Sequence, residues 1–196
     1  MVVEINKQYL PVSDANRYRL GMWVALASIV MLFTSLSSAY IVRAASSSDW
    51  QPLAMPRILL LSSVLILVSS GTLEAARRKL KHAAADAYRL WLLLTLVLGI
   101  GFLVSQLIAW RQLARQGVYV ASNPHSSFFY LLTATHGVHL LGGLGGLAYL
   151  SLRSRALQED KSAVTTAQAK ADAVTLYWHF MDFLWLYLFV LLFYVR

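Results

Sequence analysis

The sequence predicts an all-α polytopic membrane protein, a bundle of five transmembrane helices with its amino terminus in the cytoplasm and its carboxyl terminus in the periplasm. Of the 196 residues, 58% are hydrophobic and 13% are charged. A soluble domain has about 25% charged residues, because its surface must be hydrated. The apolar residues here also form long blocks with basic residues between them. These two observations favour a membrane protein over a soluble enzyme.

Five blocks are long enough to cross a membrane. A hydrocarbon core about 30 Å thick requires about 20 helical residues. Backbone amides in lipid must bond within their own segment, so each block is expected to be helical. We expect one domain over 1–196, with helices at about 20–42, 58–73, 90–110, 128–150 and 174–194.

The first three helices carry few ionisable residues. The first has small residues such as Gly21, Ser28 and Ser35, which let a neighbouring helix approach closely. The second is the shortest and ends in a polar stretch before Glu74. The third carries Gln106, which we expect to hydrogen-bond a neighbouring helix rather than a ligand.

The orientation follows from the basic residues. Twelve Lys and Arg lie in the amino-terminal tail and in the loops after the second and fourth helices, against five on the other side. The positive-inside rule places the first group in the cytoplasm. The net charge of +8 therefore reflects membrane topology, and no nucleic-acid partner is expected. Anionic lipid headgroups could bind to a basic cluster formed by Arg77, Arg78, Lys79 and Lys81. The positive-inside rule alone also explains why these basic residues occur there.

The last two helices contain four ionisable residues. His136 and His139 are three apart on the fourth helix, and His179 and Asp182 are three apart on the fifth. An ionisable residue in a membrane helix costs about 2.5–3.5 kcal/mol on insertion scales, so it normally has a partner. Counting inward from each helix end places Asp182 and His139 at nearly the same depth. We expect these four residues to form a structural polar clamp, with Asp182 bonded to His139.

Two other readings of the same four residues stay open. Imidazoles at this spacing are compatible with a metal site. A relay of histidines and a carboxyl group is also compatible with a proton path or channel. The chain has no cysteine, so no thiolate takes part in either.

The fourth helix continues into a glycine-rich stretch. Gly142, Gly143, Gly145 and Gly146 fall within five positions. Each glycine weakens a helix by about 1 kcal/mol relative to alanine in water. Such residues are typical of places where another helix comes very close. We expect a tight helix or subunit contact at Gly142 and Gly146.

These two helices resemble the signature helices of subunit III of the haem–copper cytochrome oxidases. The segments at 135–139 (THGVH) and 177–185 (YWHFMDFLW) are similar to the family patterns HG-x-H-V and YWHFVD-x-x-W. Supporting similarities are Gly21-Met22-Trp23 in the first helix and Leu98-Gly99 in the third. The resemblance covers about residues 15–196 and is to the five-helix bacterial form.

The resemblance implies a non-catalytic accessory subunit of a proton-pumping terminal oxidase in the bacterial inner membrane. It implies no haem, copper or other metal in this chain and no catalytic or cofactor-binding residue. Haem and copper are expected in partner subunits, namely the catalytic subunit I and subunit II. The implied roles are to stabilise subunit I, to support proton uptake and to bind phospholipid. Cytochrome c is the expected electron donor.

Two departures from the family pattern limit what carries over. The family usually has buried glutamates where this chain has Ile29 and Ala109, so proton-related roles of those acids do not apply. The alternatives are a subunit III-like component of a quinol oxidase or nitric oxide reductase, and a small ion transporter. Membership of a larger respiratory supercomplex is left open.

Overall fold

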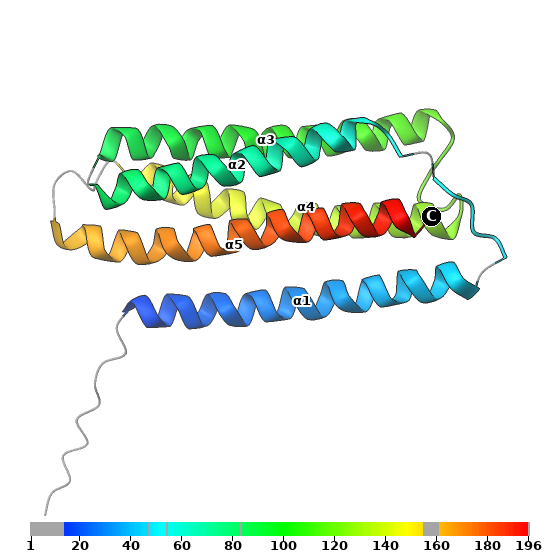
Figure 1. Cartoon of the computed structure of the whole chain (residues 1–196), viewed down its shortest axis with the longest axis horizontal. Helices are drawn as coiled ribbons and strands as arrows, with labels where there is room; N and C mark the ends of the chain where they lie inside the picture. The colour runs from blue at the N-terminus through cyan, green and yellow to red at the C-terminus, as the bar shows by residue number, and fades with distance from the viewer. Residues whose placement is uncertain (1–13, 47, 54, 83, 155–160, 196) are drawn as a thin grey trace, which may run out of the picture.

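In the structure, a computed structural model, the described residues form five helices, which pack side by side (Figure 1). It describes residues 14–46, 48–53, 55–82, 84–154 and 161–195, with backbone only at 14–18 and 161–167. The helices are α1 (Asp14–Ser46), α2 (Ile58–Lys81), α3 (Ala85–Arg115), α4 (Pro124–Arg153) and α5 (Lys161–Tyr194). The predicted all-α class is confirmed.

The α4 and α5 helices lie between α1 on one side and the pair α2 and α3 on the other. The α2 and α3 helices make the most extensive contact of the bundle, and they pack against α5 and α4 respectively. The α1 helix lies on the opposite side and contacts α4 and α5 (Figure 1). Much of α1 is left exposed, because it packs on these two neighbours along one side only.

Every helix extends beyond the apolar block that predicted it. The α2 helix was expected to end near residue 73 and continues to Lys81. Its added turns are supported by ion pairs from Glu74 to Arg77 at 3.6 Å and to Arg78 at 3.4 Å. These pairs follow the three- and four-residue spacing that stabilises a helix surface. Hydropathy identifies only the apolar part of a helix, whereas the helix continues as far as its backbone hydrogen bonds do.

Four of the described helices are long and apolar enough to cross a membrane: α1 from Arg19, α2, α3, and α5 from Gln168. The α4 helix has 30 residues, which is long enough at 1.5 Å per residue. Its three histidines and five glycines dilute its apolar residues. The predicted count of five spans therefore rests, for α4, on its length and its packing in the bundle.

The turn between α3 and α4 is encoded locally. Gly117 adopts a left-handed backbone conformation (φ 77°), which favours glycine, directly after α3. The Asn123 side chain accepts a hydrogen bond from the Ser126 amide at 3.0 Å, and Pro124 occupies the first turn of α4. This capping box fixes where α4 starts.

Trp178 ties the centre of the bundle together. Its side chain is fully buried, and its indole N–H donates to the Ser69 hydroxyl of α2 at 3.0 Å. A Cβ on Gly99 of α3 would lie 2.7 Å from the Trp178 ring, and one on Gly143 of α4 would lie 3.1 Å from it. The absence of side chains at these two glycines lets three helices converge on one indole.

The two glycines expected at a tight contact have less crowded surroundings. A Cβ on Gly146 would lie 3.3 Å from Val174 of α5, and one on Gly142 would lie 3.6 Å from the Tyr177 hydroxyl. The contact expected at Gly142 and Gly146 stays a prediction, and the glycine stretch lies against α5. Its closest point to α5 is Gly143, and Gly99 on α3 approaches the same Trp178 ring.

Candidate functional site

His179 and Asp182 lie in a polar cluster between α5 and α2. The His179 Nδ1 atom is 2.6 Å from the Ser70 hydroxyl and 4.0 Å from an oxygen of the Asp182 carboxyl group. Ser70 lies beside that carboxyl group as well. We call Ser70, His179 and Asp182 the α2–α5 cluster. It is the only place where two of the four predicted clamp residues come together within the described part of the chain.

The two ionisable members of this cluster differ in exposure. The Asp182 side chain is 5% exposed, whereas that of His179 is 40% exposed. Neither oxygen of the Asp182 carboxyl group has a hydrogen-bond partner among the described residues. An unsatisfied polar group at membrane depth is costly, because lipid supplies no partner. The cluster therefore holds an unsatisfied carboxyl group inside the bundle and exposes the His179 ring at a face of the bundle.

The predicted bond between Asp182 and His139 does not form between these two described residues. The His139 ring bonds the Thr135 carbonyl oxygen of its own helix, with Nδ1 at 2.8 Å, and packs edge-on against Phe33 of α1 at 5.7 Å between ring centroids. Its own backbone oxygen accepts from the Tyr177 hydroxyl at 2.8 Å. His139 thus faces α1, whereas Asp182 lies beside Ser70 of α2. The depth count placed Asp182 and His139 at the same level, but the two side chains face different neighbouring helices.

His136 lies apart from the α2–α5 cluster. It is fully buried, with its ring centroid 5.8 Å from that of Phe102 and 5.5 Å from that of Trp185. Neither ring nitrogen has a hydrogen-bond partner among the residues that the structure places. Within that same set, no three His, Asp or Glu side chains lie close enough together to hold a metal ion.

Hydroxyl groups of α2, to which the sequence motifs assigned no role, bond this helix to α3 and α5. The indole N–H of Trp185 donates to Ser63 at 3.0 Å, as that of Trp178 does to Ser69. Toward α3, Ser62 bonds Ser105 at 2.7 Å and Thr72 bonds Thr95 at 2.8 Å. The signal was the spacing of seven between two Ser–Ser pairs, 62–63 and 69–70, which places both on one helix face.

Two of the four basic residues at the end of α2 pair with acidic side chains. Arg77 bonds Asp172 of α5 at 2.6 Å and pairs with Glu74, which also pairs with Arg78. Lys79 and Lys81 are exposed. Lipid headgroup binding here stays a prediction that concerns the two lysines more than the two arginines.

At the opposite end, His125 attaches the α1–α2 loop to α4. Its ring stacks on Trp50, with centroids 4.9 Å apart and planes 8° apart, and its Nδ1 atom accepts a hydrogen bond from the Leu53 amide at 3.1 Å. Burial lowers the pKa of His125 below its ordinary value. His125 lies outside the 128–150 segment expected to cross the membrane.

Acidification should loosen this attachment. Because the folded pKa of His125 lies below the unfolded value of about 6.5, the contribution of neutral His125 to stability is fully present above pH 6.5 and is lost as pH falls below it. We expect the unfolding temperature to fall between pH 6.5 and 5, and this slope to flatten in His125→Gln. The control His82→Gln, at the exposed end of α2, should keep the wild-type slope. An unchanged slope in His125→Gln would contradict the assignment.

Comparison with known proteins agrees with the helix motifs. Residues 9–196 match the family described as cytochrome c oxidase subunit III. A probable cytochrome c oxidase subunit 3 of Nocardia farcinica is 31% identical over 186 residues, covering 92% of this chain and 89% of that protein. Bacillus subtilis has a cytochrome c oxidase subunit 3 that is 30% identical (89% and 84% covered) and a quinol oxidase subunit 3 that is 26% identical (87% and 83%). The chain belongs to the cytochrome c oxidase subunit III family.

Proposed function

We propose that this chain is the accessory third subunit of a proton-pumping haem–copper terminal oxidase in a bacterial inner membrane. The observation that carries the proposal is the family match over residues 9–196, with relatives named as oxidase subunits along almost their whole length. All five helices cross the membrane in this proposal. The amino terminus is cytoplasmic and the carboxyl terminus is periplasmic, as the distribution of basic residues favours.

Cytochrome c is the proposed electron donor of the complex. Relatives named cytochrome c oxidase subunit 3 are 30–32% identical to this chain, and the quinol oxidase relative of Bacillus subtilis is 26% identical. A quinol oxidase is the second candidate, because a relative named quinol oxidase subunit 3 matches 87% of this chain. The donor binds elsewhere in the complex in either case.

The contribution of this chain is a surface for its partners, subunit I with subunit II in the same complex. Electron chemistry is carried by cofactors, which we assign to those partners. The α2–α5 cluster supports a docking role for its face. His179 is 40% exposed and the Asp182 carboxyl group lacks a partner within the described chain. A helix of subunit I that offers a polar side chain at this depth would bond the exposed His179 ring, beside which Asp182 lies buried.

Proton-uptake support and phospholipid binding are part of the proposal, but not through the acids usual in the family. The corresponding positions, Ile29 and Ala109, are buried in the apolar core, at 7% and 0% exposure. A proton-related role would therefore act through the surface that this chain presents to subunit I.

Affinity purification from gently solubilised native membranes tests the proposal. We expect a tag on this chain to recover a haem-containing complex that consumes oxygen with reduced cytochrome c. Consumption with quinol alone would select the second candidate. A complex that reduces nitric oxide would contradict an oxygen-reducing assembly. A chain that purifies alone and moves ions across vesicles would contradict the accessory role altogether.

A further inference from the structure

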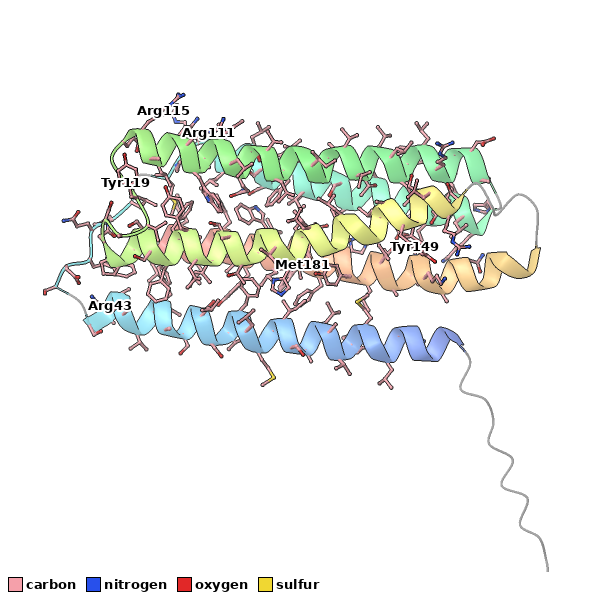
Figure 2. The ribbon with its side chains drawn as sticks, turned by 180° about the vertical axis from the view of Figure 1, so that it is seen from behind. Arg43, Arg111, Arg115, Tyr119, Tyr149 and Met181 are labelled. Atoms are coloured by element: carbon pink, nitrogen blue, oxygen red, sulfur yellow. The ribbon has the colours of Figure 1, made fainter. Side chains whose placement is uncertain are left out.

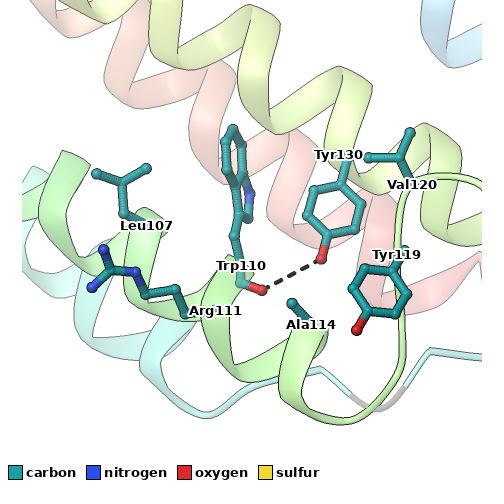
Figure 3. A pocket seen from close by; sticks show the side chains of 7 residues that line it. All are labelled: Leu107, Trp110, Arg111, Ala114, Tyr119, Val120 and Tyr130. Atoms are coloured by element: carbon teal, nitrogen blue, oxygen red, sulfur yellow. Dashed lines mark hydrogen bonds between the residues drawn. The ribbon is translucent and has the colours of Figure 1, made fainter.

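A hollow of about 340 Å³ lies where α3 ends and α4 begins (Figure 3). Three aromatic rings and one guanidinium group surround it, with aliphatic side chains between them. The residues that carry the argument are Leu107, Trp110, Arg111, Tyr119, Val120 and Tyr130. Trp and Tyr concentrate at the boundary between hydrocarbon and headgroups, and α3 changes there from apolar residues to Arg111. The hollow is thus built at an interfacial depth.

The polar atoms of two of these rings are already used within the fold. The Trp110 indole N–H donates to the Thr133 hydroxyl at 3.2 Å. The Tyr130 hydroxyl donates to the Val118 carbonyl oxygen at 3.0 Å. These two rings therefore contribute apolar surface to the hollow. Arg111 supplies its charge.

The charge at this end of the bundle is not balanced by acidic side chains. Arg111 and Arg115 are exposed one turn apart on α3, at the same end as Arg43 (Figure 2). Asp49 is the one carboxyl group that the described residues place at this end, and it pairs with Arg43 at 3.0 Å. The hollow therefore complements an anion, in contrast to the Arg77 region, where acidic partners are present.

An exposed apolar stripe leads from the hollow along α3. Ile100, Val104 and Leu107 are 48%, 49% and 54% exposed, and their spacing places them on the same helix face as Arg111. From Arg111 to Ile100 the helix rises about 16 Å, at 1.5 Å per residue. This matches one leaflet, half of a hydrocarbon core about 30 Å thick. The stripe has the length of one acyl chain.

We propose that the hollow is a binding site for an anionic phospholipid, with its phosphate on Arg111 and Arg115 and one acyl chain along the α3 stripe. Apolar surface and unbalanced positive charge occur at the depths where such a lipid has its chain and its phosphate. The site lies at the opposite end of the bundle from the basic cluster on α2. It deepens the phospholipid binding of the proposed function, on which it rests together with a membrane location for α3, and it does not depend on oxygen reduction by the complex.

Native mass spectrometry of the purified, delipidated complex tests this site. Dioleoyl-phosphatidylglycerol and the zwitterionic dioleoyl-phosphatidylcholine are titrated separately, and lipids released with this chain are counted. We expect one more phosphatidylglycerol than phosphatidylcholine on the wild type. Arg111→Gln should weaken that binding about five-fold, the change expected for one Arg near an anionic surface (about 1 kcal/mol). Arg111→Lys should retain most of it, and the control Arg57→Gln, also exposed at this end, should bind as wild type.

A photo-crosslinking amino acid at Val120 identifies what covers the hollow in the native membrane. Val120 lines it and is 57% exposed. A lipid adduct that is reduced in Arg111→Gln supports the site. An adduct to another protein subunit would overturn it, as would equal binding of both lipids with no effect of Arg111→Gln. All these readouts come from this chain itself, so they are independent of whether the complex reduces oxygen.

Discussion

Gly99→Ala is expected to lower the unfolding temperature of the complex-bound chain by about 4–8 °C. The added methyl group would lie 2.7 Å from the Trp178 ring and 2.9 Å from Leu144. Trp178 is fully buried and held by Ser69, so it cannot move aside without breaking that bond. Overpacking a core costs about 1–3 kcal/mol. The middle of that range, about 2 kcal/mol, gives a shift of about 4–8 °C, because 1 kcal/mol shifts the unfolding temperature by about 2–4 °C for a chain of this size.

Gly145 is a matched control that separates the steric clash with Trp178 from the general effect of replacing glycine by alanine. Nothing lies within 4 Å of a Cβ on Gly145. Helix propensity alone favours alanine over glycine by about 1 kcal/mol, so Gly145→Ala should be neutral or stabilising. Gly143→Ala, at 3.1 Å from the Trp178 ring, should fall between the two. Thermal unfolding followed by tryptophan fluorescence measures all three. An equal effect of Gly99→Ala and Gly145→Ala would contradict the role of Trp178 at the helix crossing.

Asp182→Ala is expected to release this chain from its complex about ten-fold more readily, with little change in its own unfolding temperature. Within the described chain, the Asp182 carboxyl group makes no hydrogen bond that the substitution would remove. Its proposed effect on docking acts through His179, which lies 4.0 Å from it and is 40% exposed to a polar side chain of subunit I. A ten-fold change corresponds to about 1.4 kcal/mol, ordinary for one hydrogen bond to an ionisable group.

The measurement is the fraction of this chain that stays with the haem-containing subunits during size-exclusion chromatography in increasing detergent. Ser37→Ala is the control, because Ser37 is also buried with an unpartnered side-chain oxygen but lies on α1. It should be retained like the wild type. Assembled Asp182→Ala complexes should still reduce oxygen. Complete loss of oxygen reduction in a fully assembled variant complex would contradict the non-catalytic role.

The sequence located the five helices well, because hydropathy marks the apolar block of each one. Rotation about each helix axis was harder to predict. His139 and Asp182 are at similar depth, yet His139 faces Phe33 of α1 and Asp182 lies beside Ser70 of α2. A depth count has no information about which neighbour a helix face meets. That information requires the packing of all five helices.

The glycine contact illustrates a similar limit. Four glycines in the sequence indicated where α4 is approached closely, but which glycine is closest depends on Trp178, a residue of another helix. The hydroxyls of α2 were detectable by their spacing. Their partners, Trp178, Trp185 and Ser105, lie 109, 122 and 43 positions away, so no local pattern pairs them.

The most direct test of the central claim is to separate this chain from the purified complex and to assay both fractions for haem, metals and oxygen reduction. The account predicts that haem and copper stay with the remaining subunits, which still reduce oxygen but lose activity sooner on warming. A haem spectrum or stoichiometric redox metal that follows this chain would contradict it.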